Sequence, residues 1–258
     1  MNMLARNIEV AHEQHWLSDE ARDYLARVRG RGWLNDIRMA FERADKLNIL
    51  FVGETIIDEY RYVQPLAKPS KEFILATVEC REPERFLGGV QAASLHADWP
   101  RTIVVTDDGE PIKKTRYVED GTARKVFEVY SKTRLEMNLG RRFNWNARIA
   151  REVKAVDVVV VMDFGHGLLA ESDRDVLISD SKFLAVNAQT NAGNYGFNPV
   201  TKYSRADLVC VDMPEAQLAS RMQTETDTAL LANEISADIV VRHLIVTQGR
   251  SGAWCSDE

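Results

Sequence analysis

Acidic residues that can bind hydroxyl groups stand at the ends of short apolar runs. Asp58 comes five residues after Gly53, which closes the run ILFVG, and Asp163 closes the run VDVVVVMD. Such runs are typical of strands buried on both faces of a parallel sheet. Open α/β sheets bind ligands beyond the carboxyl ends of their strands, so both aspartates are candidate ligand-binding residues. A carboxylate gains about 1.5–3 kcal/mol from each hydrogen bond and can therefore orient a polyol.

Two glycine patterns could bring the backbone close to a bound molecule. Gly88 and Gly89 are adjacent and open a stretch of small and apolar residues. Without side chains, they allow close backbone approach. Thr247 and Gly249 form a V-T-x-G pattern after another apolar run. That pattern is common in strands and carries little weight by itself.

Five apolar runs are predicted to be the strands of one sheet. They end at Gly53, Asp163, Asn187, Asp212 and Thr247. Helical segments separate the later runs, and alternating strands and helices predict an α/β fold with a doubly wound, mostly parallel sheet flanked by helices. The polar groups at the strand ends should therefore share one rim.

The segment from residue 59 to residue 87 alternates as exposed strands do. Tyr60 and Tyr62 share one face, and Phe73, Leu75 and Thr77 share another. The segment predicts either a small antiparallel flap or an ordinary edge hairpin.

Two further elements follow from local patterns. The stretch Arg116–Tyr130 predicts a hairpin with a two-residue turn at Asp120 and Gly121. Ser172 is a candidate cap for the helix that follows the run ending at Asp163.

The first 46 residues read as polar helices without a strand. Ser18 or Asp19 can cap the first of them, and Gly30-Arg31-Gly32 breaks the pattern before a second amphipathic stripe. No strand precedes this G-x-G, so we interpret it as a helix break and not as a phosphate loop.

Six segments in order resemble the ribokinase/PfkB-type carbohydrate kinases, closest to the heptose-phosphate kinase branch that serves ADP-heptose synthesis. They are VGETIIDEYRYV, FLGGVQAAS, VVVVMDFGHGLL, FLAVNAQTN, LVCVDMPEAQLA and LIVTQGRSGAW. The resemblance implies a ribokinase-like domain over residues 47–258, with the flap as a small antiparallel β lid over the sugar. Residues 1–46 would be an extension or linker, and in similar proteins a nucleotidyltransferase domain precedes the kinase.

The resemblance also assigns roles to individual residues. It implies an ATP-dependent kinase with Mg²⁺ that phosphorylates a sugar or a sugar phosphate, and lids of this family often pair between subunits as a homodimer. His166 would lie near substrate phosphate, with a solvated loop histidine as the expected alternative. The implied substrate-binding residues are Asp58, Gly88, Gly89 and Asp163; the cofactor-binding residues are Asn187, Thr247 and Gly249; and the magnesium residue is Glu215.

Several departures from the family pattern limit what is expected. Ala92 and Ala93 stand where an asparagine normally follows the glycine pair, and Asp212 replaces an asparagine. The sequence stops at Glu258, before the G-A-G-D stretch whose aspartate is the family's catalytic base, so the chain is expected to be an inactive fragment without a catalytic residue of its own. The alternative is a non-catalytic sugar- or nucleotide-binding module. Near residues 97–101 the family's strand, helix and strand are missing, which predicts an internal deletion or a shorter variant.

Composition excludes some other classes. The net charge of −6 gives no support for nucleic-acid binding, and no apolar run reaches the length of a membrane helix. Cys80, Cys210 and Cys255 lie far apart, which fits a reducing cytoplasm better than a disulfide framework. A dinucleotide-binding oxidoreductase would need G-x-G-x-x-G, but Gly53 is followed by Glu-Thr.

Overall fold

The computed structural model describes residues 18–66, 72 and 74–256. Contacts divide the chain into two compact units, Met1–Leu47 with Trp99–Arg101, and Asn48–Asp98 with Thr102–Glu258. Each unit is described here by itself. The functional assignment of residues 1–46 stays a prediction.

The smaller unit holds two helices, α2 (Asp19–Gly30) and α3 (Trp33–Ala44). The side chain of Ser18 caps α2 by accepting a hydrogen bond from Ala21 N at 3.3 Å. Gly32 separates the helices with a φ of 74°, a left-handed conformation that glycine adopts without steric cost. The predicted cap and helix break are therefore confirmed.

The larger unit is built on a seven-stranded sheet in the order β12-β11-β10-β9-β8-β1-β5. Its strands are parallel except for β12, which pairs antiparallel with β11 at the edge. Strand β1 is buried along its whole length, as its continuous apolar sequence predicts. The strands are β1 (Ile49–Gly53), β5 (Thr102–Val105), β8 (Val158–Asp163), β9 (Leu184–Ala188), β10 (Arg205–Asp212), β11 (Val240–Thr247) and β12 (Ala253–Cys255).

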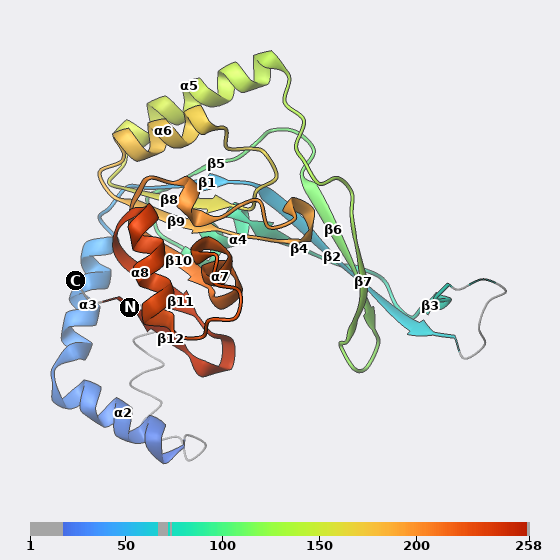
Figure 1. Ribbon diagram of the computed structural model, residues 1–258, viewed down its shortest axis with the longest axis horizontal. Helices are drawn as coiled ribbons and strands as arrows, with labels where there is room; N and C mark the ends of the chain where they lie inside the picture. The colour runs from blue at the N-terminus through green and yellow to red at the C-terminus, as the bar shows by residue number, and fades with distance from the viewer. Residues whose placement is uncertain (1–17, 67–71, 73, 257–258) are drawn as a thin grey trace. The chain divides into compact units, whose positions relative to one another are not determined.

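Helices cover both faces of this sheet (Figure 1). Helices α5 and α6 lie together on one face, and α7 and α8 lie on the other. They are α4 (Val90–Ala97), α5 (Leu139–Ala155), α6 (Glu171–Asp180), α7 (Met213–Ser220) and α8 (Thr228–Asp238), with short 3₁₀ turns η2 (Ala192–Asn194), η3 (Val200–Lys202) and η4 (Gly249–Ser251). The mostly parallel sheet flanked by helices confirms the predicted fold class.

A second, five-stranded sheet extends away from the first and forms the lid (Figure 1). Strand β2 pairs antiparallel with β3 and β4, and β6 pairs antiparallel with β7. Of the residues predicted to alternate, Thr77 begins β3, whereas Phe73 lies outside the described residues. The lid strands are β2 (Thr55–Pro65), β3 (Thr77–Glu79), β4 (Glu84–Gly89), β6 (Ile112–Glu119) and β7 (Lys125–Tyr130).

The antiparallel flap predicted over residues 59–87 is confirmed, since β2 pairs antiparallel with β3 and β4. One parallel pairing joins this flap to the β6–β7 hairpin. Strands β2 and β6 run parallel from the Ile56–Ile112 pair to the Val63–Glu119 pair. The reason lies in the main sheet, where β1 and β5 are parallel neighbours. Strand β2 continues from β1 and β6 follows β5, so both leave the same edge in the same direction.

Two local predictions also need correction. Val118 pairs with Lys125, and Glu119 N donates to Arg124 O at 2.8 Å, so the β6–β7 connection is longer than the predicted two-residue turn. A register shift between Tyr117 and Val118 accompanies the longer loop. Ser172 does not cap α6, because the helix begins at Glu171 after Ala170.

The N-terminal cap of α6 comes from a residue inside the helix. Asp173 reaches back and accepts a hydrogen bond from Ala170 N at 2.8 Å.

Near residues 97–101, α4 ends at Ala97 and β5 begins at Thr102. The deletion proposed there stays a prediction.

The buried face of α5 provides a test of core packing. Trp145, Ile149 and Val153 are buried on this face, as their spacing predicts. Ile149→Ala should lower the free energy of unfolding by about 2–5 kcal/mol, because the deleted methyl groups leave a cavity. Leu139→Ala, at the 91% exposed first residue of the same helix, is the control and should change it by less than about 1 kcal/mol. Equal losses in urea unfolding of the two variants would contradict this packing.

Candidate functional site

Polar residues gather at the carboxyl edge of the main sheet. Strand register places Gly53 beside Met162, and Met162 beside Asn187. Farther along the sheet, Asp212 lies beside Thr247. The strand ends share one edge, as the parallel arrangement predicts.

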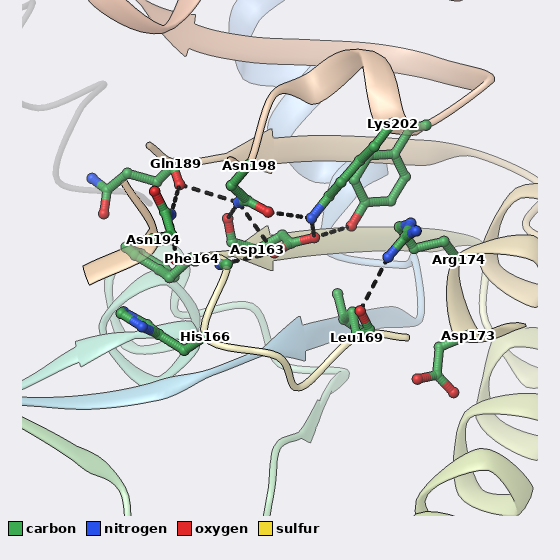
Figure 2. Close-up of polar contacts among 12 residues, drawn as sticks. Asp163, Phe164, His166, Leu169, Asp173, Arg174, Gln189, Asn194, Asn198 and Lys202 are labelled. Atoms are coloured by element: carbon green, nitrogen blue, oxygen red, sulfur yellow. Dashed lines mark hydrogen bonds and ion pairs between the residues drawn. The ribbon is translucent and has the colours of Figure 1, made fainter. Parts of the chain in front are cut away.

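Asp163 is the best-anchored carboxylate at this edge (Figure 2). It is 1% exposed and accepts hydrogen bonds from Tyr203 OH at 2.6 Å and from Gly165 N at 3.0 Å. Lys202 Nζ lies 2.5 Å from its Oδ2, and Asn198 Nδ2 lies 3.3 Å from its Oδ1. A buried charge needs such compensation. These contacts fix the carboxylate of Asp163 in position.

A second buried carboxylate, that of Glu54, holds the loop after β8. Glu54 follows β1, is fully buried, and accepts hydrogen bonds from Phe164 N at 2.9 Å and His166 N at 3.1 Å. Burial, with a smaller contribution from the nearby charge of Asp163, raises the pKa of Glu54 to about 7. Sequence reasoning missed Glu54, although an acid directly after a buried strand is the signal by which Asp163 was found.

His166 is not a solvated loop histidine, so that expectation is wrong. It is 1% exposed, and its Nδ1 donates to Thr133 O at 2.9 Å. Burial lowers the pKa of His166, which favours the neutral ring.

Asparagines brace the segment that follows β9. Asn191 Nδ2 and Asn194 Nδ2 both donate to Phe164 O, at 2.9 and 3.0 Å, and Asn194 Nδ2 also donates to Gln189 O at 2.9 Å. Asn198 Nδ2 donates to Gln189 O at 3.1 Å (Figure 2). These bonds tie the segment to the loop after β8. The spacing N-A-G-N-Y-G-F-N was a visible signal that the sequence-based interpretation did not use.

A cleft lies between the lid and the segment after β9. On its lid side, Arg116 forms ion pairs with Asp58 and, at 3.1 Å, with Glu128, while Lys114 Nζ lies 3.6 Å from Glu128. Arg116 Nη1 also donates to Tyr60 OH at 3.3 Å. The cleft encloses about 450 Å³, and its lining residues are Lys114, Arg116, Lys125, Val126, Phe127, Glu128, Tyr130, Gln189, Thr190, Asn191 and Ala192.

The glycine pair lies close to Asp58 and to the end of β1. A Cβ on Gly88 would be 2.6 Å from Asp58 Oδ2, so the glycine leaves room for this carboxylate. Gly89 has a φ of 63°, and a Cβ there would be 2.1 Å from Glu54 O. The structure therefore brings Asp58, Gly88 and Gly89 together.

The predicted cofactor-binding residues Asn187, Thr247 and Gly249 lie along the same edge of the main sheet, but they differ in hydrogen bonding and in exposure. Asn187 Nδ2 donates to Cys210 O at 2.8 Å. Thr247 and Gly249 are exposed, and Gly249 has a φ of 57° with open space beside its Cα.

Glu215, the predicted magnesium residue, has both carboxylate oxygens occupied by backbone N–H groups. Oε1 accepts from Thr190 N at 3.2 Å, and Oε2 accepts from Asp212 N at 2.9 Å. Asp212 Oδ1 in turn accepts from Glu215 N at 2.8 Å, which makes a capping box for α7. Asp212 is the more exposed of the two acids.

Across residues 18–66, 72 and 74–256, no group of three or more His, Cys, Asp or Glu side chains is placed to hold a metal ion. Over the same residues, no helix is both long and apolar enough to cross a membrane.

Comparison with solved structures identifies the fold as ribokinase-like. The chain is similar to the tetrameric inhibited form of phosphofructokinase-2 from Escherichia coli, with 12% identity and a TM-score of 0.57 over 82% of this chain and 77% of that one. It is also similar to the complex of that enzyme with fructose-6-phosphate (13%, TM-score 0.56, covering 82% and 77%) and to ribokinase from Giardia lamblia (14%, TM-score 0.53, covering 82% and 72%). No family model and no curated protein matches the sequence. At these identities the likeness shows the fold alone.

The elevated pKa of Glu54 predicts a pH-dependent stability. The pKa is about 7 in the folded protein, against the ordinary 4.5, so the folded state binds more protons than the unfolded state between these values. Stabilisation from this group is lost as pH rises through 7. Wild type should therefore lose stability relative to Glu54→Gln between about pH 5 and about pH 8, by at most roughly 1.4 kcal/mol per pKa unit of the shift.

Urea unfolding of both proteins across this range measures the difference. Glu59→Gln is the control, because its cationic neighbours Arg85, Arg61 and Lys113 lower the pKa of Glu59 to about 2, despite burial. The gap between Glu59→Gln and wild type should stay constant from about pH 5 to about pH 8. A constant gap for Glu54→Gln as well would contradict the raised pKa.

Proposed function

We propose that this chain is the ATP-dependent carbohydrate kinase domain of its protein, acting on a sugar or sugar phosphate. The observation that carries the proposal is the cleft between the lid and the carboxyl edge of the main sheet. Arg116 and Glu128 form an ion pair on its lid side, Asp58 pairs with the same arginine, and residues 189–192 form its other wall. The ribokinase-like fold supports the same class of activity.

The charges in this cleft suit sugar hydroxyls. Glu128 and Asp58, the ion-pair partners of Arg116, are acceptors, and Lys114, Arg116 and Lys125 are donors, so both kinds of group are present with an excess of positive charge. Each hydroxyl group is both a donor and an acceptor and can therefore bond to this alternating set. Hydrogen bonds to charged partners are the stronger ones and would orient the sugar.

The proposed nucleotide site lies at the β11 end of the carboxyl edge of the main sheet. Thr247 and Gly249 are exposed there and provide a hydroxyl group and an unobstructed backbone. Bound magnesium would neutralise phosphate charge and would retain most of its water shell. Because Glu215 already accepts two backbone hydrogen bonds, exposed Asp212 is the better placed of the two acids to hold an ion through water.

Two finer features belong to the proposal. Because the sequence resembles the heptose-phosphate kinase branch, the proposed sugar is a heptose-phosphate-like compound. The lid also provides a surface for pairing with a second copy, because Leu87, Phe127 and Val129 are large apolar residues that stand exposed on it.

A non-catalytic binding module is the second candidate. It is favoured by the structural use of Asp163 and Glu215, whose carboxylates are held by other groups of the chain. Both candidates require sugar binding in the lid cleft, but only the kinase turns over ATP.

Calorimetry with ATP, fructose 6-phosphate and heptose phosphates tests binding, and ADP release tests turnover. Asp58→Asn should weaken sugar-phosphate binding at least about tenfold, because it removes a charged acceptor. Asp120→Asn, in the lid loop, is the matched control and should bind as wild type does.

Each result has a defined meaning. Sugar-dependent ADP release supports the kinase, whereas binding without turnover supports the binding module. A folded protein that binds neither the sugar phosphates nor ATP would contradict both candidates.

A further inference from the structure

A separate cavity shares no lining residue with the lid cleft. It encloses about 380 Å³ between the loop after β8 and the segment 193–202, and we call it the loop cavity. Asp163, Arg134 and Lys202 are its charged lining residues, so the wall carries one net positive charge.

We propose that the loop cavity is a second ligand site that binds a phosphate monoester carried on a ring, with Arg134 and Lys202 on the phosphate and Tyr195 and Phe197 against the ring. The proposal goes beyond the kinase function, because it concerns a cavity distinct from the sugar cleft.

Arg134 is a cation without a partner. Within the part of the chain that the structure describes, its guanidinium makes no hydrogen bond or ion pair, although most other cations near the site are paired. Gly167 has a φ of 83°, and a Cβ there would lie 3.0 Å from Arg134 Nε. The missing side chain therefore lets Arg134 lie against the loop at the cavity. A guanidinium is suited to grip a phosphate with two parallel hydrogen bonds.

Lys202 offers a further donor. Its ammonium group has three N–H donors, of which Asp163 and Asn198 accept two (Figure 2). The side chain is 20% exposed and lines the cavity, so one donor remains for an occupant. Because Asp163 is held by Tyr203 as well, its own charge is already compensated.

Two aromatic rings complete the site. Tyr195 and Phe197 line the cavity and are 80% and 87% exposed. Asn194 holds their backbone, since Gly196 N donates to Asn194 Oδ1 at 3.1 Å and Phe197 N donates to Asn194 O at 2.9 Å. Exposed rings on an ordered turn can stack on a sugar or aromatic ring without reorganising. The combination of cations and rings favours a cyclic phosphate monoester over free phosphate.

Binding titrations of the 258-residue chain test the proposal, with phosphorus NMR and calorimetry as the readouts. The ligands are inorganic phosphate, methyl phosphate, phenyl phosphate and glucose 6-phosphate. Phenyl phosphate and glucose 6-phosphate should bind more tightly than methyl phosphate. Arg134→Ala should weaken binding of phenyl phosphate at least about tenfold, and Arg134→Lys should recover part of the loss. Arg124→Ala, an exposed arginine of the lid loop, is the matched control and should bind as wild type does.

Further variants separate this site from the sugar cleft and test the rings. Phe197→Ala should reduce the preference for phenyl over methyl phosphate, while Asp58→Asn should leave phenyl phosphate binding unchanged. Circular dichroism confirms that each variant is folded. Binding that survives Arg134→Ala, or falls equally in Arg124→Ala, would overturn the assignment. Loss in Asp58→Asn would place the phosphate in the lid cleft and would also overturn it.

Discussion

The buried carboxylate of Glu54 joins the parts of this structure that form the candidate site. Its side chain binds two backbone N–H groups of the loop after β8, and its carbonyl oxygen accepts from Val90 N at the start of α4. One residue thus ties the end of β1, the loop that carries Asp163 and the helix that follows the glycine pair. Because an unpaired buried N–H group is costly, loss of this carboxylate would destabilise the conformation of the loop.

Two negative side chains in one buried region require local compensation. Asp163 obtains it from Lys202, Tyr203 and Asn198, whereas Glu54 has only backbone donors. Burial, followed by the nearby charge of Asp163, raises the pKa of Glu54 to about 7. Removing the ammonium of Lys202 would take away the ion-pair partner of Asp163, so this lysine has a structural role beside its place in the loop cavity.

The sheet could be predicted from sequence because its information is local. Continuous apolar runs such as ILFV fixed β1, and the polar residue after each run placed the site edge. Predictions failed where distant pairing decided the outcome. The length of the β6–β7 loop, which was predicted too short, depends on a register shift, and the parallel β2–β6 pair, for which no prediction was made, depends on the neighbouring positions of β1 and β5. Neither is visible in a short segment of sequence.

The site residues also divide into those that local sequence predicts and those that depend on distant pairing. Asp58, Gly88 and Gly89 could be found by spacing, and the structure brings them together. Their charged partner Arg116 comes from a strand 58 positions away, and its role becomes visible only when β2 and β6 pair. Similarly, the sequence places Glu54 directly after a buried strand and His166 in a loop, but it does not show that both side chains are buried. Burial turns Glu54 into an acceptor for the loop and keeps His166 neutral. The chemistry of this edge therefore depends on residues that acquire their function only from neighbours distant in sequence.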